Sequence, residues 1–186
     1  MVLFVKMKKL ILFVLMTLTP LVLAAKNDYG ISVFSFLQGH RSEVQGKFDE
    51  ALDHYKKALR ANPDSSEIRS ALAFLYVKKG DTPRAEELLK EAIEIDPSNR
   101  KALLLLGGIY SAKGEHSKAK PIYEKCVEMN PEDTEANLFL GSIYIAEKNY
   151  SQALKLYEKI LSYDEDNIIT LYYIGRLSAE LKDYEK

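Results

Sequence analysis

Three histidines and one cysteine are the residues of this chain best suited to metal binding or nucleophilic chemistry. None of His40, His54 and His116 has the spacing of a metal ligand with another histidine or with Cys126. A single cysteine also cannot form an internal disulfide. These residues therefore predict neither a metal site nor a disulfide framework.

Two short polar segments match known sites only in part. Residues 164–167 read Asp-Glu-Asp-Asn but lack the glycine and the distal glutamate of a calcium loop. Residues 149–151 read Asn-Tyr-Ser, a glycosylation pattern that matters only in a eukaryotic secretory pathway. A phosphate-binding glycine loop and a nucleophile elbow do not occur. We therefore expect no catalytic residue, no cofactor and no metal, and a protein that is not an enzyme.

The elements that would position any site recur every 34 residues. One position always holds alanine, a second holds a small residue, a third holds tyrosine or leucine, and a fourth holds proline in three repeats. The four series are Ala51, Ala85, Ala119 and Ala153; Gly39, Ala73, Gly107, Gly141 and Gly175; Tyr55, Leu89, Tyr123 and Tyr157; and Pro63, Pro97 and Pro131. Several positions that share one period indicate an array of internal repeats.

Each repeat has the signals of two antiparallel helices. Leu103, Leu106 and Tyr110 have the three- and four-residue spacing of a helix's buried stripe. The small residues let two helices approach, because a larger side chain there would cost roughly 1–3 kcal/mol through overpacking. The prolines end the second helix of a pair. Glycines mark the turn inside the first three pairs, at Gly46, Gly80 and Gly114.

Local signals place individual helix ends. Asp64 and Glu67 have the spacing of a capping box at a helix start. Asp81 precedes Pro83, as an N-cap precedes a proline in the first turn of a helix. The fourth repeat has Glu165 in place of proline, which predicts a more continuous helix after that repeat.

These positions resemble the signature of the tetratricopeptide repeat. The residues that carry the resemblance are Leu106, Gly107, Tyr110, Ala119, Tyr123 and Pro131 in the third repeat, and Leu140, Gly141, Tyr144, Ala153 and Tyr157 in the fourth. The resemblance implies an all-α fold, a right-handed α-solenoid of antiparallel helix pairs with about four full repeats and a truncated fifth. The repeat domain is expected over residues 32–186. Its repeats are expected at 32–65, 66–99, 100–133 and 134–167, with an incomplete repeat at 168–186.

The first 24 residues are expected to direct export. Lys8 and Lys9 precede an apolar run from Leu10 to Leu23, which is followed by Ala24 and Ala25. A basic head, an apolar body and a small-residue exit are typical of a signal peptide, with cleavage after Ala24 and a lead-in over residues 25–31. We therefore predict a periplasmic or cell-envelope protein. The alternative is an uncleaved membrane anchor over residues 10–25, although this run is shorter than the ~20 residues that span a bilayer comfortably.

The charge of the chain argues against nucleic acid as its partner. Lysine and arginine number 26 and aspartate and glutamate 27, and three of the lysines lie within the first nine residues. The rest of the chain is mildly acidic and has no basic cluster of the kind that binds phosphates. A protein or peptide partner is therefore expected, with membrane contact only through the first segment.

The resemblance also implies a concave groove along the first helices of the pairs. Carried over by the 34-residue step, the residues expected to contact a partner are Phe36, His40, Phe74, Val77, Leu104, Leu138, Ile145, Tyr172 and Arg176. This set is mostly apolar and lacks the lysines and asparagines with which some family members hold an acidic C-terminus. An extended or helical peptide docked through apolar side chains is therefore expected. Alternatively, some of these apolar residues only pack against the adjacent repeat.

We predict a non-catalytic scaffold or adaptor that binds a protein segment in the cell envelope of a bacterial-type cell. The fifth repeat stops before its second helix is formed, so we expect a fragment or the N-terminal part of a longer protein. This leaves an alternative function, the recognition module of a larger envelope enzyme or of a secretion or assembly component. A third possibility is self-association through the uncapped C-terminal end.

Overall fold

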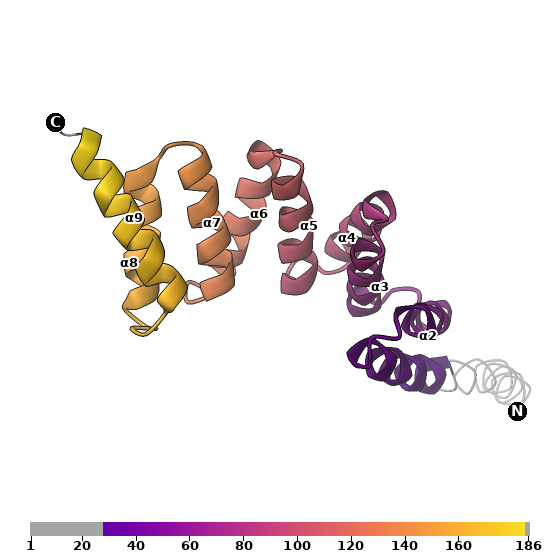
Figure 1. Cartoon of the computed structure of the whole chain (residues 1–186). Coiled ribbons are helices and arrows are strands. Elements are labelled where there is room, and N and C mark those ends of the chain that lie inside the picture. The colour runs from indigo at the N-terminus through magenta and orange to yellow at the C-terminus, as the bar shows by residue number, and fades with distance from the viewer. Residues whose placement is uncertain (1–27, 185–186) are drawn as a thin grey trace, which may run out of the picture.

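The computed structural model describes residues 28–184, and all regular secondary structure in this range is helical. After a helical stretch at residues 28–44 come α2 (Phe48–Ala61), α3 (Ser66–Lys78), α4 (Thr82–Ile95), α5 (Arg100–Ala112), α6 (His116–Met129), α7 (Thr134–Ala146), α8 (Tyr150–Leu161) and α9 (Ile168–Tyr184). Successive helix pairs stack in one row, with the two ends of the row far apart (Figure 1). The predicted all-α solenoid is therefore confirmed.

Two predictions concern residues near the N-terminus. The proposed signal peptide, residues 1–24, lies outside the described residues. Of the predicted lead-in, residues 28–31 are already helical. Within residues 28–184, no helix is both long and apolar enough to cross a membrane.

A side chain from the second helix fills the space inside each pair. It is a tyrosine opposite glycine in three repeats and a leucine opposite alanine in one: Tyr55 with Gly39, Leu89 with Ala73, Tyr123 with Gly107 and Tyr157 with Gly141. These tyrosines and the leucine are at most 1% exposed. A Cβ added to any of the three glycines would lie 2.5–2.6 Å from a ring carbon of its tyrosine. The small residue is therefore required by the ring that it faces. At Gly175 an added Cβ would meet no atom within 4 Å.

A residue in the left-handed conformation follows the first helix of each pair. Gly46, Gly80 and Gly114 take φ values of 73°, 80° and 74°, which confirms the predicted turns. The fourth repeat has Lys148 at this position, with φ of 58°. Left-handed backbone costs roughly 1–2 kcal/mol for a residue that has a Cβ, so this turn is strained relative to the other three.

Side-chain caps begin the first helices. Ser65, Asn99, Asp133 and Asn167 each accept a hydrogen bond from the backbone N–H three residues later, at 2.9–3.2 Å. The cap of α3 is therefore Ser65, and the prediction of Asp64 was wrong by one residue. Glu67 still contributes, because it accepts a hydrogen bond from the Ser65 hydroxyl at 3.1 Å. The predicted cap at Asp81 is confirmed at the start of α4.

The predicted continuous helix after the fourth repeat is wrong. α8 ends at Leu161, and α9 begins only at Ile168. Asn167 caps α9 and also donates from Nδ2 to Asp164 at 2.8 Å, so polar side chains make the break that proline makes elsewhere. α9 then runs on to Tyr184.

Candidate binding groove

The first helices of the pairs form one face of the row, which we call the groove face. It consists of residues 28–44 and of α3, α5, α7 and α9. Hollows lie at its N-terminal end, in its middle and at its C-terminal end, with volumes of about 190, 360 and 80 Å³. Only the middle hollow is lined exclusively by first helices.

The middle hollow has an apolar floor and a charged rim. It is lined by Phe74 from α3, by Arg100, Lys101, Leu104 and Leu105 from α5, and by Glu135 and Phe139 from α7. Leu104 is 7% exposed, and Phe139 stacks on the buried ring of Tyr123 with 5.2 Å between ring centres. Packed helices therefore hold the floor in place before any partner arrives. Its volume falls in the range of about 300–1,000 Å³ that is typical of binding pockets.

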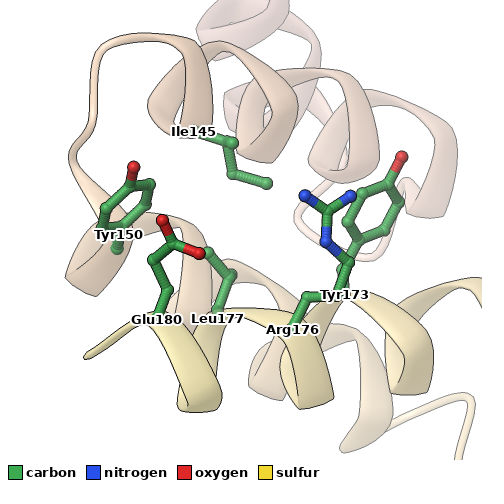
Figure 2. A pocket seen from close by; sticks show the side chains of 6 residues that line it. All are labelled: Ile145, Tyr150, Tyr173, Arg176, Leu177 and Glu180. Carbon is green, nitrogen blue, oxygen red and sulfur yellow. The ribbon is translucent and has the colours of Figure 1, made fainter. Parts of the chain in front are cut away.

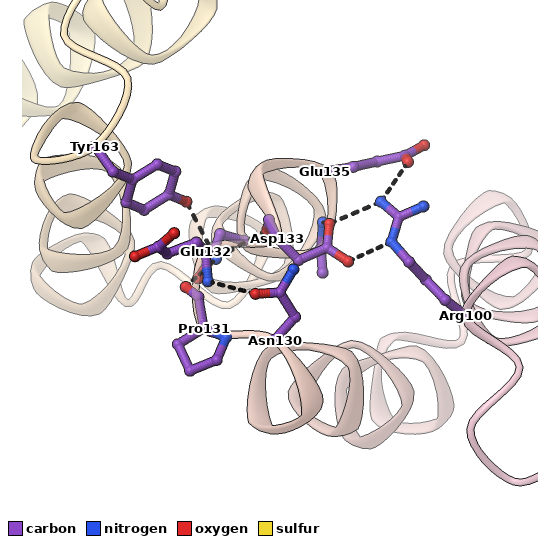
Figure 3. Close-up of polar contacts among 9 residues, drawn as sticks. Arg100, Asn130, Pro131, Glu132, Asp133, Glu135 and Tyr163 are labelled. Carbon is purple, nitrogen blue, oxygen red and sulfur yellow. Dashed lines mark hydrogen bonds and ion pairs between the residues drawn. The ribbon is translucent and has the colours of Figure 1, made fainter.

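Arg100 ties the two sides of the middle hollow together (Figure 3). Its Nη2 donates to Asp133 at 2.8 Å and to Glu135 at 2.9 Å, so it links the start of α5 to the start of α7. Asp133 is 5% exposed and also caps α7. The hydrogen bond from Arg100 lowers the pKa of the Asp133 carboxyl and raises the pKa of the guanidinium. The charge of Arg100 is therefore satisfied within the protein.

Two lysines beside the middle hollow, Lys78 and Lys101, differ from Arg100 in their charge interactions. The ammonium groups of Lys78 and Lys101 lie 5.2 and 5.4 Å from the centre of the Phe74 ring. Neither lysine forms an ion pair within the part of the chain that the structure describes. Among the described residues, these two positive charges therefore have no carboxylate within ion-pair distance.

The C-terminal hollow lies between α7, α8 and α9 (Figure 2). It is lined by Ile145, Tyr150, Tyr173, Arg176, Leu177 and Glu180. The guanidinium of Arg176 lies 5.8 Å from the centre of the Tyr172 ring. A water molecule occupies about 30 Å³ of liquid volume, so this space suits at most one small side chain.

The nine predicted contact residues are spread along the groove face. Phe74 and Leu104 line the middle hollow, Phe36 lines the N-terminal hollow, and Ile145 and Arg176 line the C-terminal hollow. Tyr172 is 60% exposed, and His40 and Val77 are also exposed. Leu138 is half-buried against the core around Tyr157. The positions differ in accessibility, and their contact with a partner stays a prediction.

The groove-face positions 12 residues before each buried tyrosine also face the core; they are Glu43, Ser111 and Ile145. The Tyr55 hydroxyl donates to Glu43 at 2.5 Å, and the hydroxyls of Tyr123 and Ser111 lie 3.4 Å apart. Burial, followed by the hydrogen bond to Glu43, raises the pKa of Tyr55. The corresponding residue in the fourth repeat is Ile145, which offers no polar atom. The buried Tyr157 hydroxyl accordingly lacks a hydrogen-bond partner in the described part of the chain.

Sequence reasoning missed five residues of the middle hollow: Arg100, Lys101, Leu105, Glu135 and Phe139. Four of them belong to two further series with the same 34-residue step, Val33, Glu67, Lys101, Glu135 and Ile169, and Leu37, Ala71, Leu105, Phe139 and Tyr173. Lys101 lies three residues before Leu104, and Leu105 directly follows Leu104. A helix brings neighbours at this spacing to one broad face, so the periodicity could have revealed them.

The residues first considered for chemistry do not form a reactive site. Cys126 is buried, and burial raises the pKa of its thiol to about 11, so it is almost entirely protonated at neutral pH. Among the side chains that the structure describes, no group of three or more histidine, cysteine, aspartate or glutamate residues could hold a metal ion.

The stacked helix pairs and the hollowed groove face are those of an α-solenoid built for protein interaction. The family model of the tetratricopeptide repeat matches residues 45–106, 77–121 and 111–169, which together span more than half of the chain. The protein belongs to the tetratricopeptide repeat family. The fold of this family is typically non-catalytic and serves as a scaffold that binds proteins or peptides.

Several solved structures share this fold. A crystal structure of MamA protein is 26% identical, with a TM-score of 0.70, and the match covers 79% of this chain and 80% of that one. YrrB, described as a TPR protein with an unusual peptide-binding site, is 21% identical, with a TM-score of 0.67 and coverages of 80% and 76%. PilF of Pseudomonas aeruginosa is 20% identical, with a TM-score of 0.76 and coverages of 85% and 72%. A search of curated proteins found no match.

Proposed function

We propose that this protein is a non-catalytic scaffold that binds an extended or helical segment of a partner protein along its groove face. The observation that carries the proposal is the preformed middle hollow, whose floor is apolar and whose lining comes from three successive first helices. YrrB has a peptide-binding site on the same fold. The inert thiol of Cys126 and the scattered histidines support a role without catalysis.

Gly108 offers a way to test this function without disturbing the core. It lies on α5, one turn beyond Leu104, and a Cβ added there would meet no atom within 4 Å. The change Gly108→Phe should therefore place a ring over the groove face while the packing inside the pair stays intact. A matched control is Ser117→Phe, because Ser117 is exposed at the start of the second helix α6.

The experiment is a selection of random 12-residue peptides displayed on phage against the full chain. The affinity of the enriched peptides would then be measured by fluorescence anisotropy. We expect Gly108→Phe to weaken binding at least tenfold and Ser117→Phe to leave it unchanged, with both variants as helical as the wild type by circular dichroism. Equal binding to all three proteins would refute the groove function.

We further propose that the scaffold acts in the cell envelope after export, on the strength of the basic head, apolar run and small-residue exit of residues 1–24. The same scaffold could serve as the recognition module of a larger envelope enzyme or of a secretion or assembly component. Cell fractionation and mass spectrometry of the mature N-terminus test this setting. Export with cleavage predicts a first residue of Ala25, whereas an intact N-terminus in the membrane fraction would indicate an anchor, and an intact N-terminus in the cytoplasm would refute export.

A further inference from the structure

We propose that the middle hollow selects a segment in which a bulky apolar side chain lies within three residues of an aspartate or glutamate. The inference rests on the proposed function, because it names the chemistry of the segment that the groove face binds. The apolar side chain would occupy the floor formed by Phe74, Leu104 and Phe139. The carboxylate would lie beside Phe74, between α3 and α5.

The charge balance of the hollow carries this inference. Arg100 is paired with Asp133 and Glu135, so these three groups together carry one negative charge, on the side of the hollow formed by α7. Lys78 and Lys101 remain, one from α3 and one from α5, and both ammonium groups lie over one phenylalanine ring. The ring attracts each cation only weakly and leaves its hydrogen-bond donors available. A carboxylate can accept from such donors and gain a charge-assisted hydrogen bond.

Other ligand chemistries fit this hollow less well. A basic side chain would bring a third cation toward two ammonium groups. A wholly apolar segment would remove water from Lys78 and Lys101 without giving them a partner. A nucleic acid needs more phosphate contacts than two lysines provide. The N-terminal hollow is lined by Glu67 and by no lysine or arginine, and the small C-terminal hollow is lined by Arg176 together with Glu180, so the preference for acid belongs to the middle hollow and fixes the register of the segment.

The test uses the peptides selected on the full chain, synthesised with amidated C-termini so that side chains supply the only carboxylates. We expect enriched sequences to carry aspartate or glutamate within three residues of a large apolar residue. Replacing these acids by asparagine or glutamine should weaken binding at least tenfold. The variants Lys78→Gln and Lys101→Gln should weaken acid peptides about three- to tenfold each and shrink the difference between acid and amide peptides.

Two lysines elsewhere provide controls that share the contact with an aromatic ring, but each is already paired with a glutamate. Lys118 and Lys120 lie on α6 with their ammonium groups 5.3 and 4.6 Å from the centres of the Tyr110 and Tyr144 rings. Neither lysine lines any of the three hollows, so the variants Lys118→Gln and Lys120→Gln should bind acid peptides as the wild type does. Equal losses at these lysines would show a general charge effect and overturn the inference.

The remaining outcomes separate the inference from the proposed function. Selected peptides without an acid, or amide peptides that bind as tightly as acid ones, would overturn the acid preference, and the groove function would stand if Gly108→Phe still blocked binding. Peptides that bind wild type and Gly108→Phe equally would overturn both. Loss of binding to short RNA or DNA in Lys78→Gln, without any effect on peptides, would also contradict the assignment.

Discussion

Two adjacent glycines on α5 should respond to alanine with opposite signs. Gly107 faces the buried ring of Tyr123, and an added Cβ would lie 2.6 Å from Cε1 and 2.7 Å from Cζ. Gly108 faces the groove, and its Cβ would meet no atom within 4 Å. The variants Gly107→Ala and Gly108→Ala therefore make the same chemical change at neighbouring positions, and only the first creates a collision.

The magnitudes follow from two effects. Alanine is more favourable than glycine inside a helix by roughly 0.5–1 kcal/mol, and both variants gain this amount. Gly107→Ala also overpacks the pair, at a cost of roughly 1–3 kcal/mol, because Tyr123 is fully buried and stacked on Phe139. We therefore expect Gly108→Ala to raise the free energy of unfolding by about 0.5–1 kcal/mol. The free energy of unfolding of Gly107→Ala should be lower than that of Gly108→Ala by about 1–3 kcal/mol.

The assay is urea unfolding followed by circular dichroism at 222 nm, with both variants and wild type measured together. The second repeat supplies a rescue, because it pairs Ala73 with Leu89 where the third pairs Gly107 with Tyr123. The double variant Gly107→Ala/Tyr123→Leu should lose less stability than the two single changes together. If Gly107→Ala were as stable as Gly108→Ala, the proposed reason for the glycine series would be wrong.

The remaining predictions concern single sites. Lys148→Gly should stabilise the fourth repeat by about 1 kcal/mol in urea unfolding, because glycine adopts φ of 58° without strain, and an unchanged midpoint would contradict this. Hydrogen bonds from Lys113 and Lys90 lower the pKa of Glu86 from 4.5 to about 2. This stabilisation is complete above pH 4.5 and is lost as pH falls toward 2. Because Lys90 and Lys113 are exposed to solvent, we expect the Glu86 ion pairs to contribute only roughly 1 kcal/mol. In Glu86→Gln, the free energy of unfolding should depend less on pH between 4.5 and 2. Cys126 should react with maleimide at pH 7 only after urea unfolds the chain, and rapid labelling of the native protein would contradict its burial.

The repeat architecture could be predicted because each of its signals is local. Gly114 reports a left-handed turn, and Gly107 with Tyr123 reports a close approach of two helices, whatever the rest of the chain does. The predictions of helix ends failed where a side chain outside the repeat pattern caps a helix. Asn167 starts α9 after a break that contains no proline, and α3 is capped by Ser65, one residue after the expected Asp64.

The groove face was predicted less completely because the predicted contact residues follow only narrow lines along the first helices. Phe74 and Leu104 line the middle hollow, but a hollow between helices also takes residues from the flanks of those lines. Lys101 and Glu135 lie on such flanks. The absence of ion pairs at Lys78 and Lys101 within residues 28–184 depends on three-dimensional neighbours, and a repeat pattern does not encode it.

Two joints between successive repeats are stabilised by different polar interactions, so they should respond differently to salt. At the joint between α3 and α5, the α5 cap Asn99 donates to Ser66 at 2.6 Å and to Ser70 at 3.1 Å, and all three residues are buried and uncharged. Between the third and fourth repeats, the half-exposed Arg100 joins Asp133 and Glu135. Dissolved ions screen the second joint and hardly affect the first. Raising the salt concentration should therefore weaken the second joint more than the first, so that the tolerance of the row to salt differs along its length.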